Sequence, residues 1–286
     1  MQKNMKYVIS NDHVTAKINL FGAELTSLQC RKREYIWNGD AQFWAKQAPV
    51  LFPIVGTLKN NCYVYDQKNY TLNRHGFARD CNFKMVNSST NEVTFSLCSN
   101  PCTLKIFPFK FELQINYKLH FKSLLVSYTV SNHDTKTIPF SIGAHPAFTL
   151  QQNISAYALQ FEQQEVLKSY KLHEGLLTSK FDTIALKNKI MTLDYNLFKD
   201  DALVFKRMIS KKITLLEHHK PLLSISYKNF EHFGIWTVAN APFICLEPWL
   251  GYSDSENHDQ NILHKEAIQI LKENCTFDCS YTITII

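Results

Sequence analysis

The sequence has no hydrophobic run long enough to cross a membrane. The apolar stretch APVLFPIVG spans only residues 48–56, whereas a membrane-spanning helix needs about 20 apolar residues in a row. The first residues, MQKNMKYVISNDHV, contain lysines but no apolar segment follows them, so they do not resemble a secretory signal. We therefore expect a cytoplasmic protein with no membrane partner.

Dense positive charge is also missing. The formal net charge is +6, but the longest basic runs are Arg31 to Arg33 and Lys211 to Lys212, each diluted by its neighbours. A nucleic-acid-binding surface normally carries a denser stripe of lysine and arginine. The charge pattern therefore predicts no nucleic-acid partner.

Linkers, low-complexity segments and repeats of fixed period are absent as well. A chain of 286 residues could form one large all-β domain or two small domains, and length alone does not choose. With 45% hydrophobic and 13% aromatic residues, it can bury a substantial core. Because no break divides the chain, we expect one domain over residues 1–286.

The eight cysteines form no recognisable metal or disulfide pattern. They are spread from Cys30 to Cys279, and no secretory signal precedes them, so free thiols are expected. Two pairs, Cys98/Cys102 and Cys275/Cys279, have three residues between them, which is not the usual zinc spacing. We expect no metal site.

Hydrophobic alternation with a period of two is the main structural signal. It runs through VTAKINL (14–20), FELQINYKLHF (111–121), LLVSYTV (124–130) and YTITII (281–286), and it is typical of half-buried strands. Helical patterns are scarce, and the best are short, over residues 42–46 and 262–271. Many closely spaced strands predict an all-β fold, a large antiparallel β-sandwich with a few short helices.

Three polar stretches interrupt this alternation: LNRHGFARDCNF (72–83), FSIGAHPAFTL (140–150) and APFICLEPWLGYSDS (241–255). The first follows a loop that Pro49, Pro53 and Gly56 force on the chain. In the third, Glu247 ends an apolar strand and lies two residues before Trp249. A carboxylate in such a place is costly unless it has a partner or a chemical task.

Each stretch also has a purely structural interpretation. His145, in the second stretch, could cap a strand end, and Glu247 could belong to an ion pair. Arg74, His75 and Arg79 could form a solvated loop. Two histidines and one carboxylate at loop or strand ends are, however, the set that an acid/base site needs.

The order of four motifs, PVLFPIVG, HGFARD, GAHPAF and LEPWLGYSD, resembles the aldose 1-epimerase or galactose mutarotase-like family, in particular its shorter bacterial branch. The resemblance covers essentially the whole chain. It implies a large antiparallel β-sandwich with a cleft for a pyranose sugar and no metal or organic cofactor. The implied activity is interconversion of the α and β anomers of a hexose or hexose phosphate.

The resemblance also implies roles for individual residues. Glu247 matches the base that removes the proton of the C1 hydroxyl, and His145 matches the acid that protonates the ring oxygen. His75 matches a second histidine that donates to oxygens near the anomeric centre. We expect Glu247 to act as a carboxylate of raised pKa and His145 to be protonated when it acts.

Sugar-binding residues are expected beside this set. Asp201, rather than Asp200, in FKDDALVF matches an aspartate that binds sugar hydroxyls. Trp249, Phe77 and Phe148 are candidates for stacking on the sugar, from their place in the motifs alone.

One position departs from the family pattern. Many relatives have an arginine where this chain has Thr57, and threonine cannot replace a bidentate guanidinium. Lys59, Arg74 or Arg79 could supply the missing contact, with Arg79 pointing inward and Arg74 facing solvent. Alternatively, the ligand differs from a plain hexose, and the positive charge keeps a sugar phosphate among the candidate ligands.

Two other functions are alternatives to this activity. A protein of the same fold could bind or sense a sugar without catalysis. A glycoside hydrolase or lyase module would need a second carboxylate, for which Asp254 is a weaker candidate. The identity of the sugar, the pathway and the choice between monomer and homodimer stay open.

Overall fold

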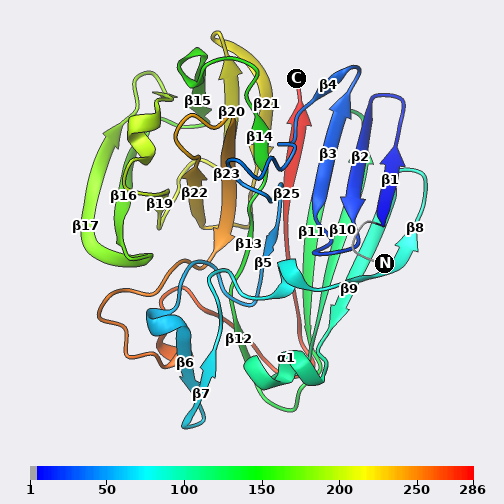
Figure 1. Ribbon diagram of the computed structural model, residues 1–286, viewed down its shortest axis with the longest axis vertical. Coiled ribbons are helices and arrows are strands. Elements are labelled where there is room, and N and C mark those ends of the chain that lie inside the picture. The colour runs from blue at the N-terminus through cyan, green and yellow to red at the C-terminus, as the bar shows by residue number, and fades with distance from the viewer. Residues whose placement is uncertain (1–4) are drawn as a thin grey trace.

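Strands dominate the computed structural model, which describes residues 5–286 (Figure 1). The strands are β1 Lys6–Ser10, β2 Val14–Asn19, β3 Leu25–Cys30, β4 Arg33–Glu34, β5 Val50–Leu51, β6 Cys62–Tyr65, β7 Lys68–Thr71, β8 Lys84–Ser88, β9 Glu92–Cys98, β10 Phe111–His120, β11 Ser123–Asn132, β12 Ile138–Phe140, β13 Ile142–Ala144, β14 Ala147–Thr149, β15 Tyr157–Phe161, β16 Val166–His173, β17 Leu176–Ala185, β18 Ile190–Thr192, β19 Leu203–Phe205, β20 Lys212–Glu217, β21 Lys220–Ser226, β22 His232–Trp236, β23 Phe243–Leu250, β24 Gln269–Leu271 and β25 Thr276–Ile285. The helices are α1 Pro101–Ile106 and the short 3₁₀ turns η1 Lys59–Asn61, η2 Ala78–Asp80, η3 Ile154–Ala156, η4 Tyr195–Phe198 and η5 Ile262–His264.

Two large sheets form the body of the molecule. One has nine strands in the order β18-β15-β20-β21-β25-β11-β10-β9-β8, and the other has the order β17-β16-β19-β22-β23-β13-β5, with β14 also paired to β23. Strands β1 to β4 form a third sheet, and the hairpin β6-β7 lies with α1 at one end of the molecule (Figure 1). The named strands pair antiparallel throughout the described residues. The prediction of an antiparallel all-β fold is confirmed.

Alternation in the sequence becomes alternation of burial in the strands. Along β10 and β11, every second side chain is buried, and the two strands pair from Phe111 with Asn132 to His120 with Ser123. β2 and the second half of β25 show the same pattern. Since one face of each strand packs inward, a shift of one residue would expose a whole row of apolar side chains, so the register is strongly specified.

The core is continuous across the sheets. One cluster of buried apolar residues contains Ile9 near the start of the chain and Ile285 near its end. The Tyr117 side chain on β10 reaches the connection between β2 and β3, where its hydroxyl donates to the carbonyl of Ala23 at 2.7 Å. The expected single domain over residues 1–286 stays a prediction, to which this shared core lends support. Among the described residues, no helix is long and apolar enough to cross a membrane.

Both predicted helices are wrong over most of their length. Residues 42–46 form turns, because the N–H groups of Phe43 and Trp44 both bond the carbonyl of Asp40 and no further helical turn follows. Residues 262–271 contain only η5 and then strand β24, since Ala267, with φ of 62°, interrupts any helix.

The sequence contains a capping signal at the start of helix α1, a helix that was not among the predicted ones. Asn100 accepts from the N–H groups of Cys102 and Thr103, and the Thr103 hydroxyl oxygen accepts from the Asn100 N–H. Pro101 follows at the first helical position. This reciprocal cap and the proline are a typical helix start.

Asp254, in the segment after β23, takes part in a buried ion pair and also holds the loop at residues 53–59. Lys265 Nζ lies 2.7 Å from Asp254 Oδ1, and both side chains are almost completely buried. Asp254 also accepts from the Lys59 N–H at 2.9 Å and donates its own N–H to the carbonyl of Thr57. Gly56 packs directly on Ser253 at this junction. The loop is therefore fixed by buried backbone contacts.

We predict that Gly56→Ala destabilises the fold strongly. Gly56 has φ of +75°, and a Cβ there would lie 2.3 Å from Ser253 Oγ and 2.5 Å from the Ser253 nitrogen. Strain and overpacking together should lower the free energy of unfolding by about 3 kcal/mol or more, measured by urea titration. Gly39→Ala is the matched control. Gly39 has a similar φ of +77°, but its nearest neighbour would be a side-chain carbon, Gln47 Cγ at 3.2 Å, and not a backbone atom. It should cost only about 1–2 kcal/mol, and equal losses for the two variants would contradict the packing argument.

Candidate active site

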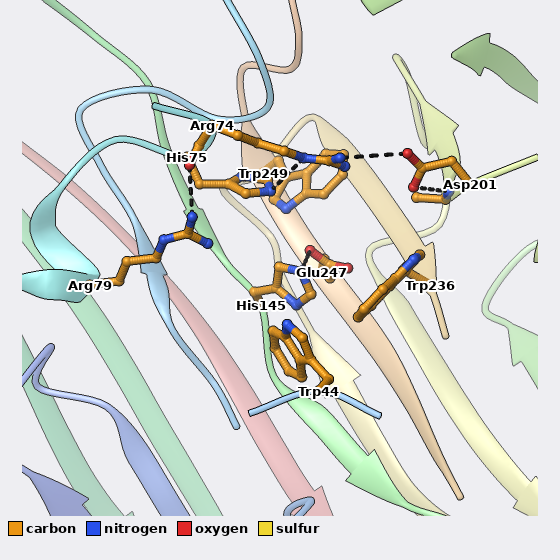
Figure 2. A pocket seen from close by; sticks show the side chains of 10 residues that line it. Trp44, Arg74, His75, Arg79, His145, Asp201, Trp236, Glu247 and Trp249 are labelled. Atoms are coloured by element: carbon orange, nitrogen blue, oxygen red, sulfur yellow. Dashed lines mark hydrogen bonds and ion pairs between the residues drawn. The ribbon is translucent and has the colours of Figure 1, made fainter. Parts of the chain in front are cut away.

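Side chains from six separate segments meet in one cavity of about 270 Å³ (Figure 2). Glu247 and Trp249 come from β23, Trp236 from the end of β22, and His145 from the link between β13 and β14. The cavity is lined by Trp44, Arg74, His75, Arg79, His145, Asp201, Ala202, Trp236, Glu247 and Trp249. β23 supplies the buried Glu247, whereas the two buried histidines, the two arginines and Asp201 come from segments between strands.

Most residues expected from the sequence line this cavity. They are Glu247, His145, His75, Asp201, Arg79, Arg74 and Trp249. Arg74 was expected to face solvent, and it does stay 44% exposed, but its guanidinium reaches over the cavity. Whether these residues act as predicted is not tested by their position.

Other expected residues lie outside the cavity. The Lys59 ammonium group donates to the carbonyl of His258 at 3.1 Å, so it points away from the site. Phe148 is fully buried in the core, and Phe77 packs against that core. Asp254 is used in the ion pair with Lys265 and offers no second carboxylate to the cavity.

The sequence analysis missed two aromatic residues of the site. Trp44 was assigned to a short helix, and Trp236 ends a strand in a stretch that was not singled out. The ring of Trp44 stacks on His145 at 4.7 Å between centroids, and Trp236 meets the same imidazole edge to face at 5.7 Å. No local sequence motif marks either residue as part of the site, because both approach His145 only in the folded structure.

Glu247 is buried in the middle of β23. Only 1% of its surface is exposed, and its Oε2 lies 3.3 Å from His145 Nε2. Within the described chain, Oε2 has no hydrogen-bond partner. Burial raises the pKa of Glu247 well above its ordinary value, and the nearby Arg74 only partly opposes this. Burial therefore favours the protonated, neutral carboxyl group in the ligand-free site.

His145 is also buried, and its charge is disfavoured. Burial, with a further contribution from Arg79 and Arg74, lowers the pKa of His145 to about 3. The imidazole is therefore neutral at neutral pH in the absence of ligand. The sequence led us to expect an ionised Glu247 beside a protonated His145. That state has the same number of protons, with one proton moved from the Glu247 carboxyl group to the His145 imidazole.

His75 is held by a reciprocal contact with Gly56. The His75 N–H donates to the Gly56 carbonyl at 2.8 Å, and the Gly56 N–H donates to His75 Nδ1 at 3.1 Å. Burial, followed by repulsion from Arg74 and His145, lowers the pKa of His75 well below its ordinary value. A neutral imidazole that accepts at Nδ1 carries its proton on Nε2, so His75 can donate from that nitrogen.

Thr57 does not line the cavity. Its backbone bonds Ser253 and Asp254, and its side chain lies beside Gly175 in the turn between β16 and β17. The positive charges of the cavity come instead from Arg74 and Arg79. Both of these arginines lie in the segment over residues 74–79.

Trp249 is placed by two glycines on neighbouring strands. A Cβ on Gly234 would lie 2.4 Å from the Trp249 ring, and one on Gly143 would lie 2.6 Å from it. Only 5% of Trp249 is exposed, whereas Trp44 and Trp236 are half-buried. The open aromatic surfaces of the cavity therefore belong mainly to Trp44 and Trp236.

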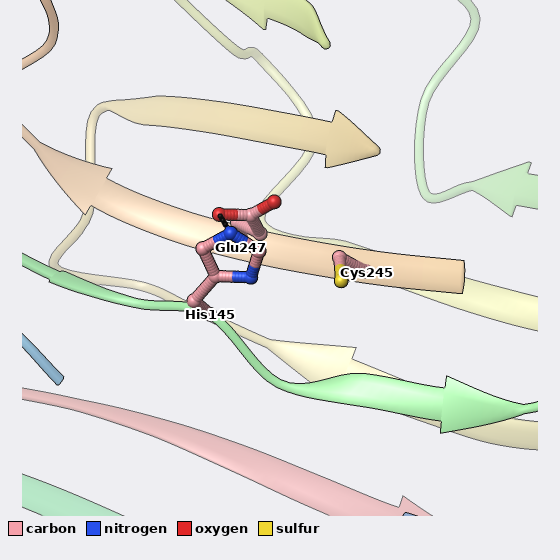
Figure 3. A group of neighbouring side chains, drawn as sticks. All are labelled: His145, Cys245 and Glu247. Carbon is pink, nitrogen blue, oxygen red and sulfur yellow. Dashed lines mark ion pairs between the residues drawn. The ribbon is translucent and has the colours of Figure 1, made fainter. Parts of the chain in front are cut away.

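Three side chains of metal-binding type come together at the base of the site (Figure 3). One ligand atom each of His145, Cys245 and Glu247 lies within 4.8 Å of the others. Burial raises the pKa of the Cys245 thiol well above its ordinary value, which opposes the thiolate that a metal needs. Cys245 also lies outside the cavity lining. The group is thus better suited to proton transfer by His145 and Glu247 than to holding a metal.

Known proteins resemble this chain in sequence and in structure. A family model described as aldose 1-epimerase matches residues 5–263. The chromosomal protein LacX of Lactococcus lactis subsp. lactis is 34% identical, over 99% of this chain and 100% of that protein. The X-ray structure of a galactose mutarotase related enzyme from Lactobacillus acidophilus superposes with a TM-score of 0.93 at 30% identity, covering 99% of this chain and 97% of that one. For a galactose mutarotase-like protein from Lactobacillus casei ATCC 334, the TM-score is 0.92 at 29% identity, covering 99% and 100%. The chain belongs to the aldose 1-epimerase family.

Proposed function

We propose that this protein is an aldose 1-epimerase that interconverts the α and β anomers of a hexose. The observation that carries the proposal is the buried pair of Glu247 and His145, whose side chains lie 3.3 Å apart in a cavity of about 270 Å³. A site that only binds a sugar has no need for a buried carboxyl group beside a buried imidazole, because both are costly to bury. Family membership supports the same function.

The reaction needs one proton acceptor and one proton donor. Opening the hemiacetal removes the proton of the C1 hydroxyl and adds a proton to the ring oxygen, which breaks the bond between C1 and that oxygen. The aldehyde then rotates and the ring closes by the reverse transfers on its other face. Glu247 is the proposed acceptor and His145 the proposed donor, and each such group typically contributes about 10² to 10⁴ in rate.

The pair holds a single proton that must change place during the cycle. Ring opening starts from an ionised Glu247 and a protonated His145, and it leaves a protonated Glu247 and a neutral His145. Burial favours the second arrangement in the empty cavity. A cyclic sugar favours the first, because its C1 hydroxyl donates to the carboxylate and its ring oxygen accepts from the imidazolium. Bound sugar therefore draws the proton from Glu247 to His145.

Other residues of the cavity position the sugar in this proposal. His75 donates from Nε2 to an oxygen near the anomeric centre, and Asp201 accepts from sugar hydroxyl groups. Trp44 and Trp236, which flank His145, offer aromatic faces to the C–H groups of the ring. Trp44 also keeps the His145 imidazole in one orientation.

We predict that Glu247→Gln abolishes mutarotation while sugar binding persists. Glutamine keeps the size and polarity of the side chain but cannot accept the C1 proton, so the rate should fall at least 10²-fold. Polarimetry of freshly dissolved α-D-glucose and α-D-galactose, with and without protein, measures this. Glu273→Gln, on an exposed side chain, is the control and should not alter the rate. Binding without any acceleration by the wild-type protein would indicate a sugar sensor and reject the enzymatic function.

We also predict that Glu247→Gln stabilises the fold increasingly as pH rises. Folding raises the pKa of Glu247 above its ordinary 4.5, so above pH 4.5 the folded chain keeps a proton that the unfolded chain has lost. The stability of the wild type therefore falls by about 1.4 kcal/mol per pH unit up to the folded pKa, and the glutamine variant lacks this loss.

The comparison is made by urea titration between pH 6.5 and 8.5. Unfolded His145, with an ordinary pKa of 6.5, is half protonated at the lower end of this range, but it is present in both proteins, so its titration cancels from the difference between them. The stability difference between Glu247→Gln and wild type should grow with pH from the lower end of the range. Glu273→Gln should show a constant difference, and a constant difference for Glu247→Gln as well would show that folding does not raise this pKa into the measured range.

A further inference from the structure

The indole N–H of Trp249 is a buried donor without an acceptor. Only 5% of Trp249 is exposed, and its Nε1 has no hydrogen-bond partner within residues 5–286. Trp37, which is similarly buried, shows the usual arrangement, because its Nε1–H donates to the carbonyl of Trp44 at 2.8 Å. A buried tryptophan normally finds a partner for its N–H. The unpaired N–H of Trp249 is therefore costly unless it gains a partner in another state of the site.

The two glycines that make room for Trp249 also fix where this N–H lies. A Cβ on Gly143 would lie 2.6 Å from Cδ1 of the indole, and a Cβ on Gly234 would lie 2.4 Å from Cζ2. These two carbons lie on either side of the ring nitrogen. Gly143 pairs with Trp249 on one side of β23, and Gly234 pairs with Glu247 on the other. The edge of the indole that carries the N–H therefore lies across β23, against both neighbouring strands.

Glu247 is the acceptor that this N–H faces. The two residues are two positions apart on β23, so their side chains leave the strand on the same face. In Figure 2, the indole nitrogen lies on the side of the ring turned toward the Glu247 carboxyl group. Burial raises the pKa of Glu247, and Arg74 and then the Trp249 N–H oppose this rise, because both favour the ionised form. Since an ionised acceptor forms a stronger hydrogen bond than a neutral one, the donor is suited to the carboxylate.

The titratable and charged groups around Glu247 cannot take the place of this donor. His145 lies 3.3 Å away, but in the proposed function it has to carry and release a proton. The Cys245 thiol, on the same strand, stays neutral because burial raises its pKa. Asp201 disfavours an ionised Glu247 through its like charge. Arg74 favours it, but its side chain is 44% exposed, so water and salt screen its charge.

We propose that Trp249 is a positioning residue that donates its indole N–H to Glu247 while Glu247 is ionised, and so keeps the carboxylate ready to accept the C1 proton. The N–H itself is not transferred. Its hydrogen bond weakens when Glu247 takes the proton of the C1 hydroxyl, and it forms again when the proton returns during ring closure. Trp249 thus acts through the base, and not by stacking on the sugar as the sequence suggested. This inference rests on the proposed function and adds a residue to its mechanism.

The first test follows the indole N–H directly and does not depend on catalysis. The chain has four tryptophans, so NMR of protein labelled with ¹⁵N at the indole nitrogens should give four N–H signals, and the one missing in Trp249→Phe belongs to Trp249. Should this variant not fold, Phe substitutions of Trp37, Trp44 and Trp236 assign the same signal by elimination. As the pH of the ligand-free protein is raised and Glu247 ionises, the signal should move downfield, because a stronger hydrogen bond deshields the proton. It should stay in place in Glu247→Gln. A signal that does not move in the wild type, or that moves equally in both proteins, would overturn the proposal.

The second test is the pH profile of mutarotation by Trp249→Phe, measured as kcat/KM by polarimetry. Phenylalanine keeps an aromatic ring but removes the N–H, so kcat/KM should fall about tenfold at neutral pH, where burial favours a protonated Glu247. The alkaline limb, where the pair of Glu247 and His145 loses its one proton in the free enzyme, should move to higher pH. The deficit should therefore shrink as pH rises through this limb, because Glu247 is then ionised with or without the donor.

Trp37→Phe is the matched control. It also removes a buried indole N–H, from a residue outside the cavity lining, and it should leave the alkaline limb at the pH of the wild type. A loss of kcat/KM in Trp249→Phe by the same factor at every pH would show that Trp249 only fills space, and would overturn the proposal. A wild-type protein without mutarotation would reject the proposed function, whereas the NMR signal of Trp249 would still decide the contact with Glu247.

Discussion

The buried contact between Glu247 and His145 is the constraint on which the rest of the site depends. Two groups that water would normally solvate lie 3.3 Å apart inside a β-sandwich, and residues 5–286 offer no hydrogen bond to Glu247 Oε2 or His145 Nδ1. Such an arrangement persists only if the surrounding structure is rigid enough to prevent relaxation. The neighbouring tryptophans, the central strand and the glycine contacts together provide that rigidity.

The position of β23 explains how the fold can hold a buried carboxyl group beside a buried imidazole. The strand lies between β22 and β13 in its sheet, and β14 also pairs with it, so its backbone groups are largely satisfied by neighbours. Glu247 and Trp249 project from the same face of it, because successive side chains alternate. The absence of a Cβ at Gly143 and Gly234 leaves space for the Trp249 ring. The sheet thus positions Glu247, and the link between β13 and β14, two strands that pair with β23, positions His145.

Patterns in the sequence predict features that depend on neighbours along the chain. The alternation in β10 and β11 predicts antiparallel strands, and Glu247 and His145 stand out because polar residues interrupt apolar strands. Trp44 was missed because a turn that depends on Asp40 and on tertiary packing was read as a short helix. Lys59 was placed wrongly because nothing local shows that the buried Asp254 binds its backbone and turns its side chain away. The raised pKa of Glu247 was predicted from its apolar neighbours. The lowered pKa of His145 could not be predicted, since it depends on burial from several strands at once.

The two cationic residues of the cavity both come from the short segment over residues 74–79, whereas the acid/base pair comes from β23 and the link after β13. In the proposed function, the two arginines and the proton-transfer pair therefore belong to separate parts of the chain. During evolution, substitutions in that segment could change which sugars are accepted while proton transfer stays intact. Substitutions in β23 are more constrained, because every side chain of this strand is buried. Relatives of this chain would then be expected to differ in ligand range more readily than in reaction type.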